Sequence, residues 1–392
     1  MALRRIQGVP VEGKTVLVRV DYNVPMAEGR IADDGRLRAS LQTLQHLIDS
    51  GAKIALISHL GRPNGEVVEE LRLAPIAARL QELLGREVHQ LDDCVGDTVQ
   101  TAIDAGAAGD VFLLENIRFR REETLNEAGF ARQLAELGDL YVDDAFATVH
   151  RSHASTVGIA DYLPSYAGFL MQREIDALTR VMEAPEKPYV AVIGGKKARS
   201  KLGALHDLVS RVDEVLIGGG VAFTFLAAFG IGAGGDELDA DLIDEIREIG
   251  ELAKERGTDI QLPVDAVCAE TLAADAETQT FLVDEVPDGW GTFDIGPKTI
   301  EQFTKHIGTA NTIVWTGPMG AFEVEPFSEG TRGIGEAIAS SGAYSVIGGG
   351  ETGDAVKRFG FEDRVSYIST GGGACLALLR GKSLRALNVL QE

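Results

Sequence analysis

Short, uniformly apolar runs alternate with longer amphipathic segments from one end of the chain to the other. The runs predicted as strands are TVLVRV (15–20), KIALIS (53–58), VFLL (111–114), LYV (140–142), YVAVIG (189–194), EVLIG (214–218), TIVW (312–315), YSVIG (344–348) and SYIS (366–369). Between them, apolar residues recur at helical spacing over 38–50, 73–85, 125–138, 171–184, 202–210, 221–229, 239–256, 298–307, 329–341 and 373–380. A strand without a polar face must be covered on both sides, and a helix between strands is the crossover that parallel pairing needs. The pattern therefore predicts an α/β protein with doubly wound, Rossmann-like parallel sheets.

The length of 392 residues exceeds what one hydrophobic core usually holds, so two domains are expected. The helical stretch 171–184 is followed by PEKP (185–188), where proline and charge interrupt the pattern. Such composition is typical of linkers between compact units. We therefore expect one domain over 1–170, a connecting helix and linker over 171–188, and a second domain over 189–381.

Charge and cysteine usage exclude several classes of partner. The chain has 37 Lys and Arg against 60 Asp and Glu, and its formal net charge of −23 is opposite to what a nucleic-acid-binding surface needs. Its three cysteines, Cys94, Cys268 and Cys375, form no CxxC pair, as expected for free thiols in a reducing compartment. No apolar secretory segment follows Met1, and no run is long enough to span a membrane. We expect a cytoplasmic protein, a monomer that binds neither nucleic acid nor membrane.

The predicted strands of the first half end in polar and basic residues. The ends read VRVDYNVP, SHLGRP, ENIRFR and DDAFATVHRSH, and they carry Asp21, Asn23, His59, Arg62, Arg118, His150, Arg151 and His153. Because the carboxyl ends of parallel strands lie at one edge of a sheet, these side chains are expected to meet there. Guanidinium groups bind phosphate and carboxylate bidentately, so the cluster predicts a pocket for a small, doubly anionic ligand. A metal at His150 and His153 is not expected, because no neighbouring carboxylate or thiolate completes a ligand set.

Glycine takes the place of these groups at the strand ends of the second half, which read VIGGKKARSK, LIGGGVAF, WTGPMGAFE, VIGGGETGD and ISTGGGAC. Glycine lets backbone N–H groups approach a ligand closely, and a helix that starts there attracts phosphate. Five such loops at one edge predict a nucleotide site, with Lys197 and Lys201 beside its phosphates. Two generic motifs do not apply. GIGAGG (230–235) follows a helical segment and is interpreted as a helix-end loop, and GKS (381–383) has Leu376 where a P-loop needs glycine.

In this order, the segments RVDYNVP, HLGRP, ENIRF, HRSHAST, GGKKARSK, GPMGAFE, GGGETGD and STGGGA resemble those of the phosphoglycerate kinase family. The resemblance runs from the first predicted strand to the last predicted helix. It implies two Rossmann-like domains joined by a helix, with a cleft that closes between them. The first domain would bind 3-phosphoglycerate or 1,3-bisphosphoglycerate, and the second Mg²⁺ with ATP or ADP. Residues 382–392 would pack back on the first domain.

The resemblance also assigns residues. Those that would hold the triose are Asp21, Asn23, Arg36, His59, Arg62, Arg118 and Arg151. Those that would bind the nucleotide are Lys197, Lys201, Glu323, Gly349, Gly350, Glu351 and Thr352. Arg36, Lys197 and the backbone N–H groups of Gly371 and Gly372 would act on the phosphoryl group in transfer, and Glu351 would lie near the magnesium.

Four positions depart from the family pattern. Glu351 stands where aspartate is usual, Thr316 where asparagine is usual, Ala147 where glycine is usual and Cys375 where serine is usual. The additional methylene of Glu351 would shift the magnesium ion or admit a water molecule between the ion and the carboxylate. The other three are expected to alter loop packing rather than the reaction.

The chemistry that the resemblance implies suits this set of residues. A carboxylate and a diphosphate oxygen are charged nucleophiles at neutral pH, so transfer from 1,3-bisphosphoglycerate to ADP, or its reverse, needs no general base. The protein must then only position the substrates, neutralise charge on the transferring group and exclude water by domain closure. Two other classes are alternatives. A nicotinamide-dependent dehydrogenase would need GxGxxG directly after a strand, and a non-catalytic nucleotide-binding regulator would not need the anion pocket. The two sites together favour the kinase.

Overall fold

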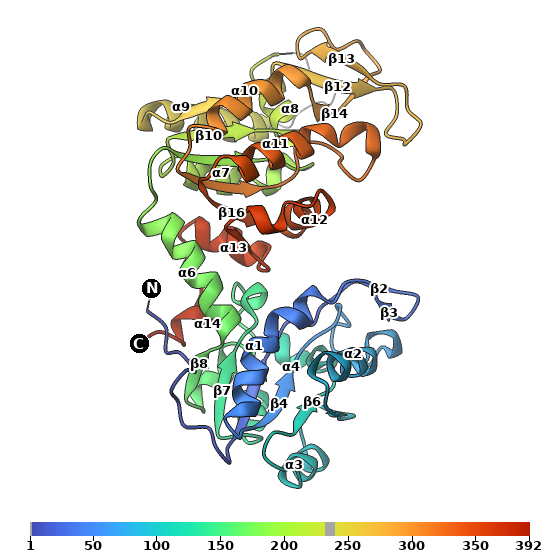
Figure 1. The fold of residues 1–392 in the computed structure, drawn as a ribbon, viewed down its shortest axis with the longest axis vertical. Coiled ribbons are helices and arrows are strands. Elements are labelled where there is room, and N and C mark those ends of the chain that lie inside the picture. The colour runs from blue at the N-terminus through green and yellow to red at the C-terminus, as the bar shows by residue number, and fades with distance from the viewer. Residues whose placement is uncertain (1, 232–239) are drawn as a thin grey trace. The chain divides into compact units, whose positions relative to one another are not determined.

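The structure is a computed structural model that describes residues 2–231 and 240–392. The chain folds into two compact units, one of Met1–Asp176 with Ser383–Glu392 and one of Ala177–Lys382 (Figure 1). The chain therefore passes between the units twice, after Asp176 and after Lys382.

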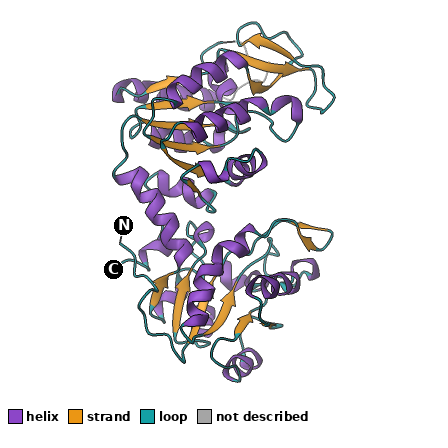
Figure 2. Cartoon of the chain, viewed as in Figure 1, coloured by secondary structure: helices purple, strands orange, loops and turns teal. Residues whose placement is uncertain are grey.

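The first unit is built on a parallel sheet of six strands in the order β5-β6-β4-β1-β7-β8. The strands are β1 (Thr15–Arg19), β4 (Lys53–Ile57), β5 (Val88–Gln90), β6 (Val111–Leu113), β7 (Leu140–Asp143) and β8 (Ser165–Ala167). The helices of this unit that lie between strands are α1 (Gly35–Asp49), α2 (Ala74–Leu84), α3 (Asp97–Asp104), α4 (Arg121–Thr124) and α5 (Ala128–Ala135). A small hairpin, β2 (Met26–Ala27) and β3 (Arg30–Ile31), precedes α1. Helices flank the sheet, as Figure 2 shows.

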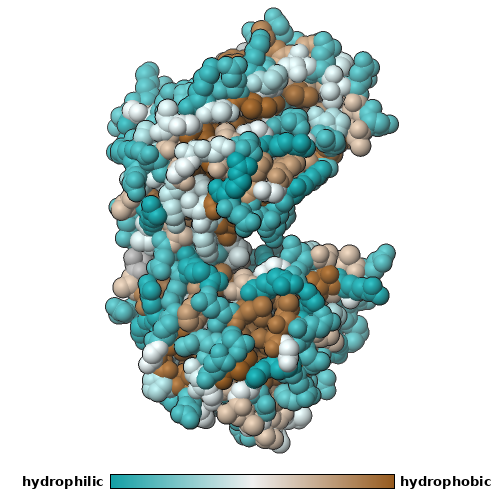
Figure 3. All heavy atoms as spheres, viewed as in Figure 1, coloured by the Kyte–Doolittle hydropathy of each residue, from teal (hydrophilic) through white to brown (hydrophobic). Residues whose placement is uncertain are grey.

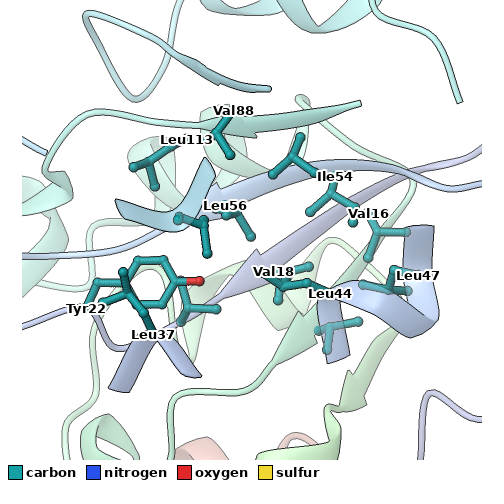
Figure 4. Packing of buried hydrophobic residues seen from close by; sticks show 14 of the residues in the cluster. Val16, Val18, Tyr22, Leu37, Leu44, Leu47, Ile54, Leu56, Val88 and Leu113 are labelled. Carbon is teal, nitrogen blue, oxygen red and sulfur yellow. The ribbon is translucent and has the colours of Figure 1, made fainter. Parts of the chain in front are cut away.

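Alternate residues of β1 enter two separate hydrophobic clusters, because successive strand side chains point to opposite faces. Val16 and Val18 pack with residues of α1 and α2 such as Leu44 (Figure 4). Leu17 packs with residues of α3 and α5 such as Leu134. All five residues of β1 are buried, which explains the continuous apolar run in the sequence. Each aliphatic side chain buried in this way contributes about 1.5–3 kcal/mol.

The second unit has a parallel sheet of six strands in the order β11-β10-β9-β15-β16-β17. The strands are β9 (Tyr189–Ile193), β10 (Glu214–Ile217), β11 (Asp259–Gln261), β15 (Thr312–Thr316), β16 (Tyr344–Gly348) and β17 (Tyr367–Ile368). The helices are α7 (Leu202–Leu208), α8 (Gly219–Ala228), α9 (Ala240–Arg256), α10 (Pro297–Ile307), α11 (Glu329–Ser340), α12 (Gly350–Arg358) and α13 (Gly373–Leu379). The predicted doubly wound α/β class is confirmed. Hydrophilic residues cover most of the visible surface of each unit (Figure 3).

The sequence did not predict a second, antiparallel sheet in this unit. It consists of β12 (Asp265–Ala269), β13 (Gln279–Leu282) and β14 (Gly291–Ile295), in the order β13-β12-β14. The segment GIGAGG begins after α8, as predicted, but residues 232–235 lie outside the described residues.

The connecting helix α6 (Phe169–Glu183) begins two residues earlier than predicted and belongs to both units. Its first turn is fixed to the end of β7, because Asp144 Oδ1 accepts hydrogen bonds from the backbone N–H groups of Leu170 (2.9 Å) and Met171 (3.2 Å). A carboxylate at a helix N-terminus satisfies free N–H groups and favours the helix dipole. The approach is so close that a Cβ at residue 168 would overlap the Asp144 carboxylate, which accounts for Gly168. The last short helix, α14 (Arg385–Asn388), lies in the first unit.

Candidate functional site

His59 marks the centre of the basic cluster at the carboxyl edge of the first sheet. It follows β4, and only 4% of it is exposed. Burial holds the pKa of His59 well below its usual range, and the guanidinium groups of Arg19, Arg118, Arg151 and Arg36 lower the pKa further, in that order. The imidazole is therefore neutral at pH 7. Four guanidinium groups therefore act on one uncharged ring, from the end of β1, from the loops after β6 and β7 and from the start of α1, as expected for an anion pocket.

The loop after β1 is held in place by its own polar side chains. Asp21 forms an ion pair with Arg36 and accepts a hydrogen bond from the Asn23 backbone N–H at 3.2 Å. Asn23 in turn accepts a hydrogen bond from the Gly61 N–H at 2.8 Å, which ties this loop to the loop after β4. Asp21 thus orients Arg36, and Asn23 fixes the two loops to each other.

The guanidinium of Arg118 has an N–H group that is available to a ligand. Arg118 is 6% exposed, and its Nη1 donates to the Gly61 carbonyl at 2.8 Å, but its buried Nε has no hydrogen-bond partner among the residues that the structure describes. Burial lowers the pKa of Arg118 to about 10, and the charges of Arg19 and Arg151 act in the same direction. A buried, unpaired donor costs free energy unless a ligand takes it, so Arg118 is suited to receive an anion. Arg151 is partly buried and Arg62 is exposed.

The sequence analysis did not predict the buried polar residues that support the basic cluster. Arg19, the last residue of β1, is fully buried; its Nε donates to Ser155 Oγ at 2.9 Å, and its Nη2 lies 3.1 Å from His59 Nδ1. Glu123 is also fully buried and accepts hydrogen bonds from the Ser155 N–H (2.9 Å) and hydroxyl (2.7 Å). A charged residue inside the apolar run TVLVRV was the available signal, because a buried arginine requires partners.

A carboxylate that the sequence analysis did not connect with the two histidines lies beside His153. Glu123 Oε1 is 3.4 Å from His153 Nδ1, since α4 brings it under the loop after β7. Burial alone would raise the pKa of Glu123, but the hydrogen bond from His153 and the charge of Arg19 hold that pKa below its usual range. Among residues 2–231 and 240–392, no group of three His, Cys, Asp or Glu side chains could hold a metal ion.

The glycine loops of the second sheet are of two kinds. A Cβ at Gly194 would overlap the Pro318 carbonyl, and one at Gly317 would overlap the Gly194 carbonyl, so these glycines allow the loops after β9 and β15 to touch each other. A Cβ at Gly350 or Gly373 would meet no atom within 4 Å. These two glycines begin α12 and α13, and none of the described residues explains their small size, as expected where a ligand approaches.

Lysine and threonine side chains join the loops at this edge. Lys201 Nζ donates to Thr316 Oγ1 at 3.1 Å, and Thr352 Oγ1 accepts from the Gly317 N–H at 2.7 Å. Burial lowers the pKa of Lys201, while the negative charge of Glu351 acts in the opposite direction. Lys197 is exposed in the loop after β9.

The remaining predicted residues lie on loops of the same unit. Glu323 is exposed in the loop after β15, and Glu351 is exposed in the first turn of α12. Gly371 and Gly372 follow β17, but the Gly371 N–H already donates to Ser369 Oγ at 3.1 Å. Contact between that N–H and a phosphoryl group would therefore require Ser369 to release it. No helix in the described part of the chain is long and apolar enough to cross a membrane.

The arrangement was compared with known proteins. A family model described as phosphoglycerate kinase matches residues 6–382. The chain belongs to the phosphoglycerate kinase family. The resemblance seen in the sequence is thereby confirmed, and the protein is a kinase of glycolytic phosphoryl transfer, whose family uses phosphoglycerate and ATP or ADP as substrates.

Solved structures of family members are similar over the whole chain. A phosphoglycerate kinase from Coxiella burnetii is 40% identical with a TM-score of 0.89, and one from Pyrococcus horikoshii OT3 is 34% identical with a TM-score of 0.88. In both cases the match covers 99% of this chain and 98% of the other.

Proposed function

We propose that the basic cluster of the first unit binds 3-phosphoglycerate or 1,3-bisphosphoglycerate, and that the glycine loops of the second unit bind ADP or ATP with Mg²⁺. The observation that carries the triose assignment is the unpartnered, buried Nε of Arg118 beside a neutral His59. The N–H of a neutral imidazole and the unpaired N–H of a guanidinium can both donate hydrogen bonds to phosphate or carboxylate. Asp21, Asn23, Arg36, Arg62 and Arg151 complete the proposed triose site.

The reaction joins the two sites by transfer of one phosphoryl group. The β-phosphate oxygen of ADP attacks the acyl phosphate, the bond to the carboxyl oxygen breaks, and 3-phosphoglycerate leaves as a carboxylate. No proton moves, so no side chain serves as a general base. Arg36 and Lys197 neutralise charge on the group in transfer, with the backbone N–H of Gly372 and, once Ser369 releases it, that of Gly371. Loss of one such contact typically raises the barrier by about 3 kcal/mol.

Glu351 is the residue we propose for the metal. Its carboxylate is exposed in the first turn of α12, and its negative charge partly opposes the lowering of the Lys201 pKa that burial causes. Mg²⁺ usually takes one or two protein carboxylates and completes its shell with substrate phosphates and water, so a single carboxylate fits. When bound, the ion would offset charge on the nucleotide phosphates. Lys201, Thr352, Gly349, Gly350 and Glu323 would bind the rest of the nucleotide.

Direct transfer requires the reacting atoms to lie about 3 Å apart, so substrates bound to separate units must be brought together. Each substrate alone contacts chiefly one unit and gives little differential energy for closure, whereas both together can bridge the units. We further propose that the protein acts as a cytoplasmic monomer.

A coupled assay with 3-phosphoglycerate, ATP and Mg²⁺ tests the activity, and calorimetry on the variant Arg151→Ala tests the division of ligands. The variant should bind 3-phosphoglycerate more weakly, because one guanidinium of the cluster is lost, and ADP with unchanged affinity. An equal loss for both ligands would contradict the assignment of one ligand to each unit. Absence of turnover in the wild-type protein would contradict the proposed function itself.

A further inference from the structure

Thr316 places a buried hydroxyl at the edge of the second sheet where the nucleotide is proposed to bind. It is the last residue of β15, and none of it is exposed. Its backbone pairs with Ile193 of β9 and Gly348 of β16, and its carbonyl accepts the Gly194 N–H at 2.8 Å. The position of the hydroxyl is thus fixed by strands on both sides.

The partner of this hydroxyl is the ammonium group of Lys201. The lysine side chain crosses the loop after β9, where a Cβ at Gly195 would lie 3.7 Å from its Cε. Its Nζ then donates to Thr316 Oγ1 at 3.1 Å, which is the one hydrogen bond that the described residues give this nitrogen. An ammonium group has three donors, so two remain for a ligand.

The same hydroxyl lies against the turn that opens α12. A Cβ at Gly349 would be 3.5 Å from Thr316 Oγ1 and 3.5 Å from Thr352 Oγ1. Thr352 Oγ1 in turn accepts the Gly317 N–H, so the Thr352 hydroxyl joins the loops after β15 and β16. The hydroxyl that holds the Lys201 ammonium therefore lies beside the N-terminus of α12, a helix of nine residues. The N-terminus of a helix attracts phosphate.

We propose that Thr316 is a positioning residue whose hydroxyl holds the Lys201 ammonium so that its two remaining donors face the phosphates of ADP or ATP. The proposal rests on the nucleotide site proposed above. A lysine side chain has many rotamers, and a fixed acceptor reduces the entropy that is lost when phosphate binds. Thr316 itself need not touch the nucleotide.

The test is a set of substitutions that separates the hydroxyl from its packing. Thr316→Val removes the hydroxyl and keeps the branched shape, and Thr316→Ser keeps the hydroxyl and removes the methyl. Calorimetry with ADP should show affinity about tenfold weaker for T316V, the usual effect of losing a hydrogen bond to a charged group. T316S should bind ADP nearly as the wild type does, and both should bind 3-phosphoglycerate normally.

The matched control is Thr312→Val at the other end of β15. Thr312 is also buried, and its hydroxyl donates to the Glu186 carbonyl at 2.8 Å, with no contact to Lys201. T312V should leave ADP affinity unchanged, whatever it does to thermal stability. If T316V does not fold, Thr316→Cys, a weak acceptor of similar size, replaces it under the same criteria.

A double-mutant cycle decides whether Thr316 acts through Lys201. In the background Lys201→Met, the additional effect of T316V on ADP affinity should disappear. Normal ADP binding by T316V, equal losses in T316S and T316V, or a full T316V effect in the K201M background would each overturn the proposal. If the wild-type protein fails to bind ADP, the proposed function fails instead.

Discussion

Gly350 offers a direct test of whether the glycines at the edge of the second sheet serve a ligand or the fold. A Cβ at this position would find no atom within 4 Å, and its φ is not in the left-handed region. Replacement by alanine therefore creates no clash and restricts the unfolded chain, which usually adds about 0.4–1 kcal/mol of stability. For a unit of this size that corresponds to a rise of about 1–4 °C in the unfolding temperature.

The same substitution should weaken nucleotide binding. The new methyl group would occupy the space next to the backbone N–H at the start of α12, where a phosphate would approach. We expect the affinity of Gly350→Ala for ADP to fall at least tenfold, which is about 1.4 kcal/mol. Scanning calorimetry without ligand and titration calorimetry with ADP measure the two effects separately.

The control is Gly250→Ala in α9, where a Cβ would only reach Phe229 Cζ at 3.4 Å. This variant should gain stability without any change in ADP affinity. The reasoning is refuted if G350A is stable and binds ADP as the wild type does. A lower unfolding temperature for G350A would refute the conclusion that the space there is open.

Three further predictions concern the metal, the buried network and the proposed closure. Glu351→Ala should raise the magnesium concentration needed for half-maximal activity; an unchanged titration would place Glu351 away from the metal. Glu123→Gln should cost about 3–5 kcal/mol near pH 7 in chemical denaturation, because the Arg19 charge stays buried without its nearby carboxylate. Since the folded-state pKa of Glu123 is lowered, its contribution exists above the unfolded pKa and is lost as pH falls through the folded one, so wild type and variant should converge in acid; a constant difference would contradict this assignment. Small-angle scattering should show a smaller radius of gyration only when both substrates are present, and equal radii for the apo protein, each binary complex and the ternary complex would exclude closure.

The central strands of the two parallel sheets were predictable because they are apolar on both faces, whereas the short edge strands β5, β8 and β11, which contain exposed or half-buried residues, were not predicted. All five residues of β1 and of β15 are buried, so each strand appears as a continuous run in the sequence. The antiparallel sheet has no such pattern. In β13 two of four residues are exposed and none is buried, and β14 contains Asp294, a fully buried carboxyl that accepts the Gly330 N–H at 2.6 Å. A charged residue in a short run indicates a turn unless its partner, here 36 residues away in sequence, is known.

The sequence-based proposals for the two sites rest on loops after strands in which one residue type carries the chemistry, as with Arg118 or Lys201. The sequence did not predict the buried polar residues that support the pocket of the first unit. Arg19 and Glu123 are held together through Ser155, three residues from different parts of the chain that meet only in the fold. The expectation that Thr316 alters only loop packing also omitted its hydrogen bond to Lys201, because no local pattern connects a strand end to a lysine 115 residues earlier.

The chain links the two units twice, once through α6 and once after Lys382. Here one link is continuous helix, with Asp144 bonded to its first turn and Arg180 stacked on the Tyr344 ring (3.8 Å) in its last. The other is the short segment after Gly381. The first unit is therefore not one continuous segment, so a fragment that ends at Asp176 would lack the ten residues Ser383–Glu392 that complete that unit.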